Sequence, residues 1–391
     1  MSLDWQRKVA ESLQKIAPSG IREFFDIVSE REDCISLGVG EPDFVSPRPV
    51  LDAAINSIRK GYTHYTGNQG LYSLRKAVSV YLESEYQLDY DPETEILITV
   101  GVSQGVDLGI RSVLNPGEAV MFNLPSYVSY SPMIELAGGV AQACALESNE
   151  DYRLSVQKLK ETKTNDSKIL LLNCPSNPTG KNISEEEAKN LSSFISDNDM
   201  LLISDEIYGE LNYDRPHQCL ASYPGLKERT LVLGGFSKSF AMTGWRVGYA
   251  AGPAPWISAM TKIHQYSMLC APTISQFAAE AALKYGLGER DKMRDAFHTR
   301  RDYIVQRMGQ IGFHCPVPDG AFYIFPALPG LGMDSLSFAK SLLDAENVAV
   351  VPGTAFGANG EGHIRCSYAS GLNDLKLACD RIENFVSKAR P

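Results

Sequence analysis

Short apolar segments of strand length alternate, over the first 285 residues, with longer segments of helical periodicity. In segment 103–113, directly after the glycine at position 101, apolar positions recur every three to four residues, which predicts an amphipathic helix. Segment 184–196 begins with Ser184 and Glu187, the residue pair of a capping box, and is predicted to be another helix. Strands that alternate with helices favour a mostly parallel sheet covered by helices on both faces. The predicted strands are 96–100, 119–124, 168–173, 200–204, 230–233 and 247–251.

The pattern changes after about residue 286 and predicts a second, α+β domain. We therefore divide the chain into a large domain, residues 45–285, and a small domain made of residues 1–44 and 286–391. The elements predicted for the second part are a long charged helix near 290–308, a strand at 321–326, a helix from 335, and strands at 348–351 and 363–368.

The N-terminal residues carry apolar side chains at helical spacing: Trp5, Val9, Leu13 and Ile16. This spacing predicts an amphipathic arm that packs on the body of the protein or on a partner subunit.

Composition and charge narrow the possible functions. The chain has 391 residues and a net charge of −10, with no long cluster of like charges, so a nucleic-acid-binding groove is not expected. No apolar segment approaches the roughly 18–20 residues of a membrane span, and charges at positions 4, 7 and 8 precede any signal-peptide core. The 8 cysteines and 6 histidines are scattered, which disfavours disulfides and a metal site. We expect a cytoplasmic protein with neither a nucleic-acid nor a membrane partner.

Chemically informative residues follow the predicted strands, where ligands bind in open α/β sheets. The glycine turn at 101 opens a helix whose free N–H groups suit a phosphate. Asn177 and Asp205 follow two other strands. Lys238 follows a further strand and stands among small and apolar residues, with Arg246 eight positions later. A lysine in such surroundings can have a lowered pKa and act as a nucleophile.

Three strings together resemble the class I aminotransferases, which are pyridoxal-phosphate enzymes of fold type I. They are Asn-Pro-Thr-Gly at 177–180, Ser-Asp-Glu-Ile-Tyr at 204–208, and Ser-Lys-Ser-Phe-Ala-Met-Thr-Gly-Trp-Arg at 237–246. Segments 38–43 and 320–326 look most like the subgroup of prokaryotic aspartate, aromatic and N-acetyl-diaminopimelate aminotransferases. The resemblance covers nearly the whole chain. It implies a large domain with a mostly parallel seven-stranded sheet between helices, a smaller α+β domain, bound pyridoxal 5'-phosphate and a homodimer.

By this resemblance, Lys238 holds the cofactor as a Schiff base and, once freed by substrate, carries a proton between the substrate's α carbon and the cofactor. Asp205 lies against the pyridine nitrogen and keeps it protonated. Asn177 and Tyr208 hydrogen-bond the ring oxygen. We therefore expect Lys238, Asp205 and Tyr208 to be the catalytic residues.

The resemblance also implies how the cofactor phosphate and ring are held. Tyr127 stacks on the ring, and Tyr65 reaches the phosphate of the neighbouring subunit. Many relatives have a hydroxyl at the position of Gly235, so one phosphate contact is either missing or made by Ser237. The other phosphate contacts are expected from Arg246 and from the helix start at Val102, Ser103 and Gln104.

Arg365 is the expected clamp for the substrate's α-carboxylate, because a guanidinium binds a carboxylate through two hydrogen bonds. Asn177 and the backbone near Gly40 would complete this clamp by resemblance. Because Arg365 and Lys238 belong to different predicted domains, substrate could draw the domains together.

The sequence does not determine which amino acid is the donor substrate. Residues 19–21, the loop near Gly40 and the region of Ser103 are expected to form the side-chain pocket. Ser103 replaces a cationic residue of some aspartate-specific relatives, which puts strict dicarboxylate recognition in doubt. Aspartate, aromatic and N-acetyl-diaminopimelate donors are alternatives, with 2-oxoglutarate as acceptor in a ping-pong reaction. A carbon–sulfur β-lyase and a non-catalytic regulator module are the rival functions.

Overall fold

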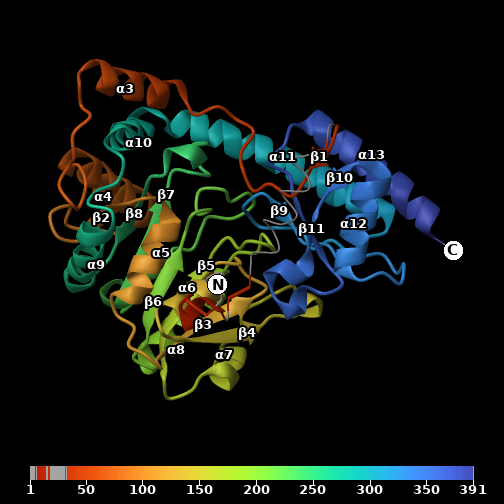
Figure 1. The fold of residues 1–391 in the computed structure, drawn as a ribbon, viewed down its shortest axis with the longest axis horizontal. Coiled ribbons are helices and arrows are strands. Elements are labelled where there is room, and N and C mark those ends of the chain that lie inside the picture. The colour runs from red at the N-terminus through yellow and green to blue at the C-terminus, as the bar shows by residue number, and fades with distance from the viewer. Residues whose placement is uncertain (1–4, 6, 15, 18–30, 32, 391) are drawn as a thin grey trace.

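The computed structural model describes residues 5, 7–14, 16, 17, 31 and 33–390. Its main sheet contains β2 (Ile96–Thr99), β3 (Ala119–Leu124), β4 (Val140–Ala145), β5 (Ser167–Asn173), β6 (Leu201–Asp205), β7 (Thr230–Gly235) and β8 (Gly248–Ala251). Their order in space is β2-β8-β7-β6-β5-β3-β4 (Figure 1). β8 is antiparallel to both neighbours, and all other pairs are parallel. The predicted α/β class with a mostly parallel seven-stranded sheet is confirmed.

The sheet is apolar on both faces because successive strand residues point to opposite sides. Leu97 and Ile203 pack under one set of helices, whereas their neighbours Ile98 and Leu202 pack under another. The first set is α5 (Val102–Arg111), α6 (Tyr130–Leu136) and α9 (Ala254–Ser267). The second is α3 (Arg48–Arg59), α4 (Tyr72–Tyr86), α7 (Val156–Thr162), α8 (Glu185–Asp197) and α10 (Thr273–Tyr285).

The seventh strand, β4, was not predicted from the sequence. It lies at the edge of the sheet, and Cys144 is the buried residue of its six. Its alanines and Gln142 give little of the apolar alternation on which strand prediction depends. The capping box predicted at Ser184 and Glu187 is present at the start of α8.

The C-terminal part forms a smaller group of helices and short strands, drawn in blue in Figure 1. Strand order β11-β12-β9 makes a three-stranded antiparallel sheet, and β1 pairs with β10. A separate core joins these elements to Leu37 from the N-terminal part. The division of the chain at residues 45 and 286 stays a prediction. The elements are β1 (Ile35–Ser36), α11 (Leu287–Ile311), β9 (Tyr323–Ile324), α12 (Ser335–Glu346), β10 (Val348–Ala349), β11 (Val351–Pro352), β12 (Ile364–Ser367) and α13 (Leu372–Ala389).

Among the described residues of the N-terminal segment, the predicted helix is present as α1 (Glu11–Gln14), preceded by a turn at Trp5. Trp5, Val9 and Leu13 are 70%, 43% and 48% exposed. These side chains therefore do not form a buried face against the described chain, and packing of the arm on a partner subunit stays a prediction.

Among the described residues, no helix is long and apolar enough to cross a membrane. Within the same residues, no group of three or more histidine, cysteine or acidic side chains could hold a metal ion.

Candidate active site

The carboxyl ends of β5, β6 and β7 meet at one edge of the sheet and open into a cleft of about 540 Å³. Its volume is typical of sites for small molecules. Residues from both parts of the chain line it. Those predicted from the sequence and found there are Gly40, Val102, Ser103, Tyr127, Asn177, Asp205, Tyr208, Ser237, Lys238, Arg246 and Arg365.

Lys238 lies just beyond β7 and extends its amine into the cleft. Its Nζ donates a hydrogen bond to the carbonyl oxygen of Gly40 at 2.6 Å. Burial lowers the pKa of this amine from 10.5 to about 8, and the nearby charges of Arg365 and Arg246 act in the same direction. With this pKa about a tenth of the amine is neutral at pH 7, far more than for an ordinary lysine, so Lys238 can act as a nucleophile.

Asp205, the last residue of β6, is a buried carboxylate in the cleft. Its Oδ2 accepts a hydrogen bond from the Tyr130 hydroxyl at 2.7 Å, and its Oδ1 accepts one from the Ile207 amide at 3.2 Å. Burial raises the pKa of Asp205 to about 6, and no cation of the described residues forms an ion pair with this carboxylate. A protonated pyridine nitrogen would supply that missing positive charge.

Asn177 and Arg365 form the predicted clamp. The Arg365 Nη1 donates to Asn177 Oδ1 at 2.9 Å, and its Nη2 donates to the carbonyl oxygen of Gly38. Asn177 is held in turn, because its amide donates to Asn173 Oδ1 at 2.9 Å. Arg365 is 3% exposed, and its Nε has no hydrogen-bond partner among the described residues. No carboxylate of the described chain pairs with this buried guanidinium, so an incoming carboxylate can take that place.

A second positive site lies at the start of α5. A Cβ built on Gly101, which has φ +77°, would lie 2.7 Å from Arg246 Nη2, so the guanidinium sits directly against the helix start. The first amide of α5 with an acceptor in the described chain is that of Gly105, which leaves the preceding amides free. Free amides, the helix dipole and a guanidinium together suit a phosphate.

Two predicted residues do not line the cleft of their own chain. The Gln104 Oε1 accepts a hydrogen bond from the Val100 amide at 2.7 Å, which turns the side chain toward its own backbone, and Gln104 is not among the residues that line the cleft. Tyr65 is 81% exposed and lies outside the cleft. Segment 19–21 lies outside the described residues.

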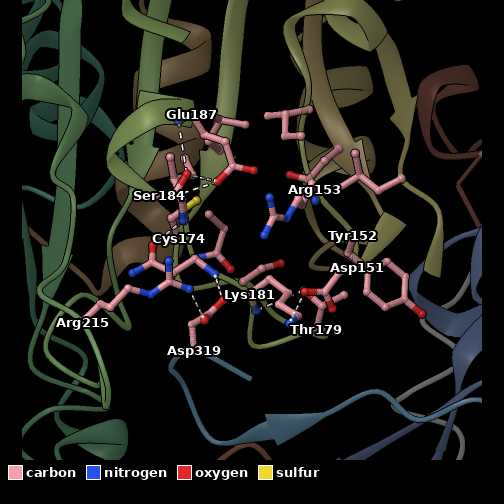
Figure 2. Close-up of a pocket in the computed structure, with 18 residues that line it drawn as sticks. Asp151, Tyr152, Arg153, Cys174, Thr179, Lys181, Ser184, Glu187, Arg215 and Asp319 are labelled. Atoms are coloured by element: carbon pink, nitrogen blue, oxygen red, sulfur yellow. Dashed lines mark hydrogen bonds and ion pairs between the residues drawn. The ribbon is translucent and has the colours of Figure 1, made fainter. Parts of the chain in front are cut away.

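The loop that carries Asn177 is hydrogen-bonded to segment 317–320, which precedes β9 of the small sheet. The amides of Asp319 and Gly320 both donate to the Gly180 carbonyl at 2.9 Å. Lys181 donates to Asp151 at 2.7 Å and to the Val317 carbonyl at 2.8 Å. Lys181, Asp151 and Asp319 also line a separate pocket of about 70 Å³, shown in Figure 2. This arrangement fixes the position of Asn177 from outside the active-site cleft.

Sequence reasoning missed Asn173, Tyr130 and Tyr323, which also line the cleft. Asn173 ends β5 four residues before Asn177, and its side chain ties Asn177 to the Asp205 carbonyl. Its place at a strand end was a usable signal. Tyr130 and Tyr323 gave no such signal, because both are 1% exposed like ordinary core aromatics. They reach polar groups of the site through their hydroxyls and, for Tyr323, also through its ring face.

The family of this chain follows from comparison with known proteins. The sequence model described as "Aminotransferase class I and II" matches residues 32–382. The chain belongs to the class I and II aminotransferases. YugH of Bacillus subtilis, named as an aminotransferase, is 46% identical over 97% of this chain and 98% of its own. A second Bacillus subtilis protein, named for N-acetyl-LL-diaminopimelate, is 40% identical over 96% of this chain and 95% of its own.

Solved aminotransferase structures have the same fold. The aspartate aminotransferase of Thermus thermophilus with maleate superposes with a TM-score of 0.91 at 33% identity, covering 96% of this chain and 99% of that one. The aromatic aminotransferase of Pyrococcus horikoshii gives a TM-score of 0.89 at 37% identity, covering 94% and 99%. The likeness confirms an enzyme of the transaminase type with the pyridoxal-phosphate fold type I.

Class I aminotransferases use pyridoxal 5'-phosphate, and the cleft has the chemistry to hold it. It combines an amine of lowered pKa, a buried carboxylate without a cationic partner, and free helix amides beside a guanidinium. These match the aldehyde, the pyridine nitrogen and the phosphate of the cofactor, respectively.

Proposed function

We propose that this aminotransferase moves the α-amino group of an L-amino acid of aspartate or aromatic type to a 2-oxo acid such as 2-oxoglutarate. The observation that carries the proposal is the position of the Lys238 amine and the Arg365 guanidinium, which line one cleft and hydrogen-bond to the same loop, at Gly40 and Gly38. One group can hold a proton at the reacting carbon while the other holds the carboxylate attached to it.

Pyridoxal phosphate supplies, when bound, an aldehyde that condenses with amines and a ring that accepts an electron pair. Lys238 is the proposed attachment point. Asp205 would keep the ring nitrogen protonated, and the hydroxyl of Tyr208 and the amide of Asn177 would donate to the ring oxygen. The phosphate would be held by Arg246, Ser237 and the amides of Val102, Ser103 and Gln104, with Tyr127 against the ring.

Arg365 would bind the substrate's α-carboxylate through two parallel hydrogen bonds. This contact, with Asn177 and the backbone near Gly40, would direct the α-hydrogen toward Lys238. The freed Lys238 amine would then take the proton from the α carbon and return it at the cofactor side. Two such half-reactions, one for each substrate, give the proposed ping-pong sequence.

The charges of the described residues that line the cleft favour a donor amino acid whose own side chain is uncharged. Lys238, Arg246 and Arg365 are the cations among the lining residues, and each has a role already. Ser103 adds a hydroxyl rather than a charge. Because no further cation among the described lining residues is left to bind a second carboxylate, an aromatic donor is favoured over aspartate. N-acetyl-LL-diaminopimelate is the alternative donor, supported by the relative at 40% identity.

The proposed active site is completed by a second copy of the chain. Tyr65 and Tyr266 are 81% and 88% exposed, and Met268 and Leu269 are also exposed. Asn68 donates to the Leu269 carbonyl at 2.8 Å, which holds the two exposed segments together. Exposed apolar patches of this kind mark interfaces. Sedimentation equilibrium should give a dimer, and Tyr65→Phe should weaken cofactor binding; a monomer with full cofactor affinity would contradict this part.

The absorbance of the purified holoenzyme, with single L-amino acids and no oxo acid, tests the function. Loss of the cofactor band with phenylalanine or tyrosine, and release of the matching oxo acid, is the expected result. The same result with aspartate or N-acetyl-LL-diaminopimelate alone would select that donor. Pyruvate and ammonia with a persistent band would identify a lyase instead and overturn the proposal.

A further inference from the structure

Tyr323 connects three parts of the proposed site, although the resemblance of segment 320–326 to the subgroup assigns this tyrosine no role. It lies on β9, which pairs with β12 in the register Ser367↔Tyr323 and Cys366↔Ile324. Arg365 is therefore the diagonal neighbour of Tyr323 on the same face of the small sheet. The Arg365 guanidinium lies over the Tyr323 ring, 4.5 Å from its centroid.

The hydroxyl of Tyr323 reaches the other side of the site. It lies 2.8 Å from the Tyr208 hydroxyl, and no other hydrogen-bond partner of either hydroxyl is found among the described residues. It also lies against the loop that accepts the Lys238 amine, since a Cβ on Gly40 would come 2.1 Å from it. One buried side chain thus touches the carboxylate clamp, the cofactor-ring tyrosine and the lysine's backbone partner.

The direction of the hydrogen bond between the two phenols follows from their surroundings. Each neutral phenol has a single hydrogen to donate. Burial raises the pKa of both groups, so both keep that hydrogen at neutral pH. If Tyr208 donates to the cofactor's ring oxygen, as proposed above, Tyr323 is left as the donor to Tyr208. A hydrogen bond received by a hydroxyl strengthens the one that this hydroxyl donates.

We propose that Tyr323 is a positioning residue of the aminotransferase reaction. Its hydroxyl donates to Tyr208 and so directs and strengthens the hydrogen bond from Tyr208 to the cofactor ring, while its ring supports Arg365 as the carboxylate clamp. This inference rests on the proposed function of the site. If it is right, the effects of the Tyr323 hydroxyl and of its ring can be measured separately, by one substitution that removes the hydroxyl alone and another that removes the ring as well.

The test compares Tyr323→Phe, Tyr323→Leu and the control Tyr368→Phe as holoenzymes. Tyr368 is a matched control because it is fully buried in the same core and donates to the Ala321 backbone at 3.3 Å instead of to the site. Two quantities are measured: the pH midpoint of the cofactor's absorbance change, and the Kd of 3-phenylpropionate, a monocarboxylate without an amine.

Tyr323→Phe should raise the pH midpoint by about 0.5 unit, because a weaker Tyr208 donation stabilises the ring oxygen's negative charge less. Its Kd for the carboxylate should stay within about twofold, since the ring under Arg365 remains. Tyr323→Leu should raise the midpoint similarly and weaken carboxylate binding by about tenfold. In steady-state assays, kcat should change in both Tyr323→Phe and Tyr323→Leu, whereas KM should change in Tyr323→Leu but not in Tyr323→Phe. Tyr368→Phe should change neither quantity.

An unchanged midpoint in Tyr323→Phe, or an equal shift in Tyr368→Phe, would overturn the inference while leaving the proposed function intact. Equal carboxylate affinity in Tyr323→Leu and the wild type would overturn the role of the ring. A wild-type protein that shows no titrating cofactor band would instead overturn the proposed function, and this inference with it.

Discussion

Replacing Lys238 by methionine should stabilise the cofactor-free protein at neutral pH. Folding lowers the pKa of this amine from 10.5 to about 8 through burial. Below pH 8 the folded state must therefore hold an ammonium group in surroundings that disfavour it. The difference of about 2.5 pH units corresponds to about 3 kcal/mol. Loss of the hydrogen bond to the Gly40 carbonyl offsets about 1 kcal/mol, so Lys238→Met should gain about 2 kcal/mol at pH 7.

The gain should depend on pH in a defined direction. Between pH 8 and 10.5 the unfolded lysine keeps its proton while the folded one has lost it, so wild-type stability rises with pH relative to the variant. The advantage of Lys238→Met should be close to zero at pH 10.

Urea unfolding of the cofactor-free proteins at pH 7 and pH 10, at one fixed protein concentration, measures both values. Lys262→Met is the control, because Lys262 is exposed on α9 and should give a difference below about 0.5 kcal/mol at either pH. A Lys238→Met protein that is no more stable than wild type at pH 7, or whose gain in stability is the same at both pH values, would show that burial of the Lys238 ammonium does not destabilise the folded protein.

Three further substitutions test other parts of the site. Arg365→Lys should lower kcat/KM by about 10- to 100-fold, since an ammonium cannot make the two parallel hydrogen bonds; equal kcat/KM values would exclude the clamp. Asp205→Asn should lower kcat by about 10²- to 10³-fold in steady-state assays, because a neutral amide cannot stabilise a protonated ring nitrogen, and near-normal turnover would refute that role. Gly180→Ala should reduce the free energy of unfolding by about 2–4 kcal/mol, since its Cβ would lie 2.3 Å from Pro318 at a φ of +68°. Gly117→Ala, at a φ of +87° with open space around it, should lose only about 1 kcal/mol in the same denaturation experiment, and equal losses would show that crowding is not the cause.

The sequence predicts the buried strands of the large sheet well because each is a continuous apolar segment between turn or helix signals. β4 escaped prediction because an edge strand has one side in solvent and needs fewer apolar residues. The predicted strand at 321–326 is reduced to Tyr323 and Ile324, because Ala321 donates to Leu211 outside the sheet and Pro326, which has no amide hydrogen, accepts from Ile364 of β12 without donating in return. Tertiary contacts of this kind leave no local pattern.

The candidate site was predictable where chemistry and strand ends coincide, as at Asp205 and Lys238. Contacts made through the tips of buried aromatics were not, because Tyr130 and Tyr323 have the burial of ordinary core residues. The orientation of the Gln104 side chain could not be predicted from the sequence either, since this side chain can face either the ligand or its own backbone. The structure shows that it bonds the backbone of Val100.

Lys238 is the residue to which we propose that the cofactor attaches. Borohydride reduction of the holoenzyme, followed by proteolysis and peptide mass spectrometry, tests it directly. The added mass of the reduced cofactor should be found on Lys238, and Lys238→Met should carry none. Modification of a different lysine, or none in a protein that retains its cofactor band, would contradict it.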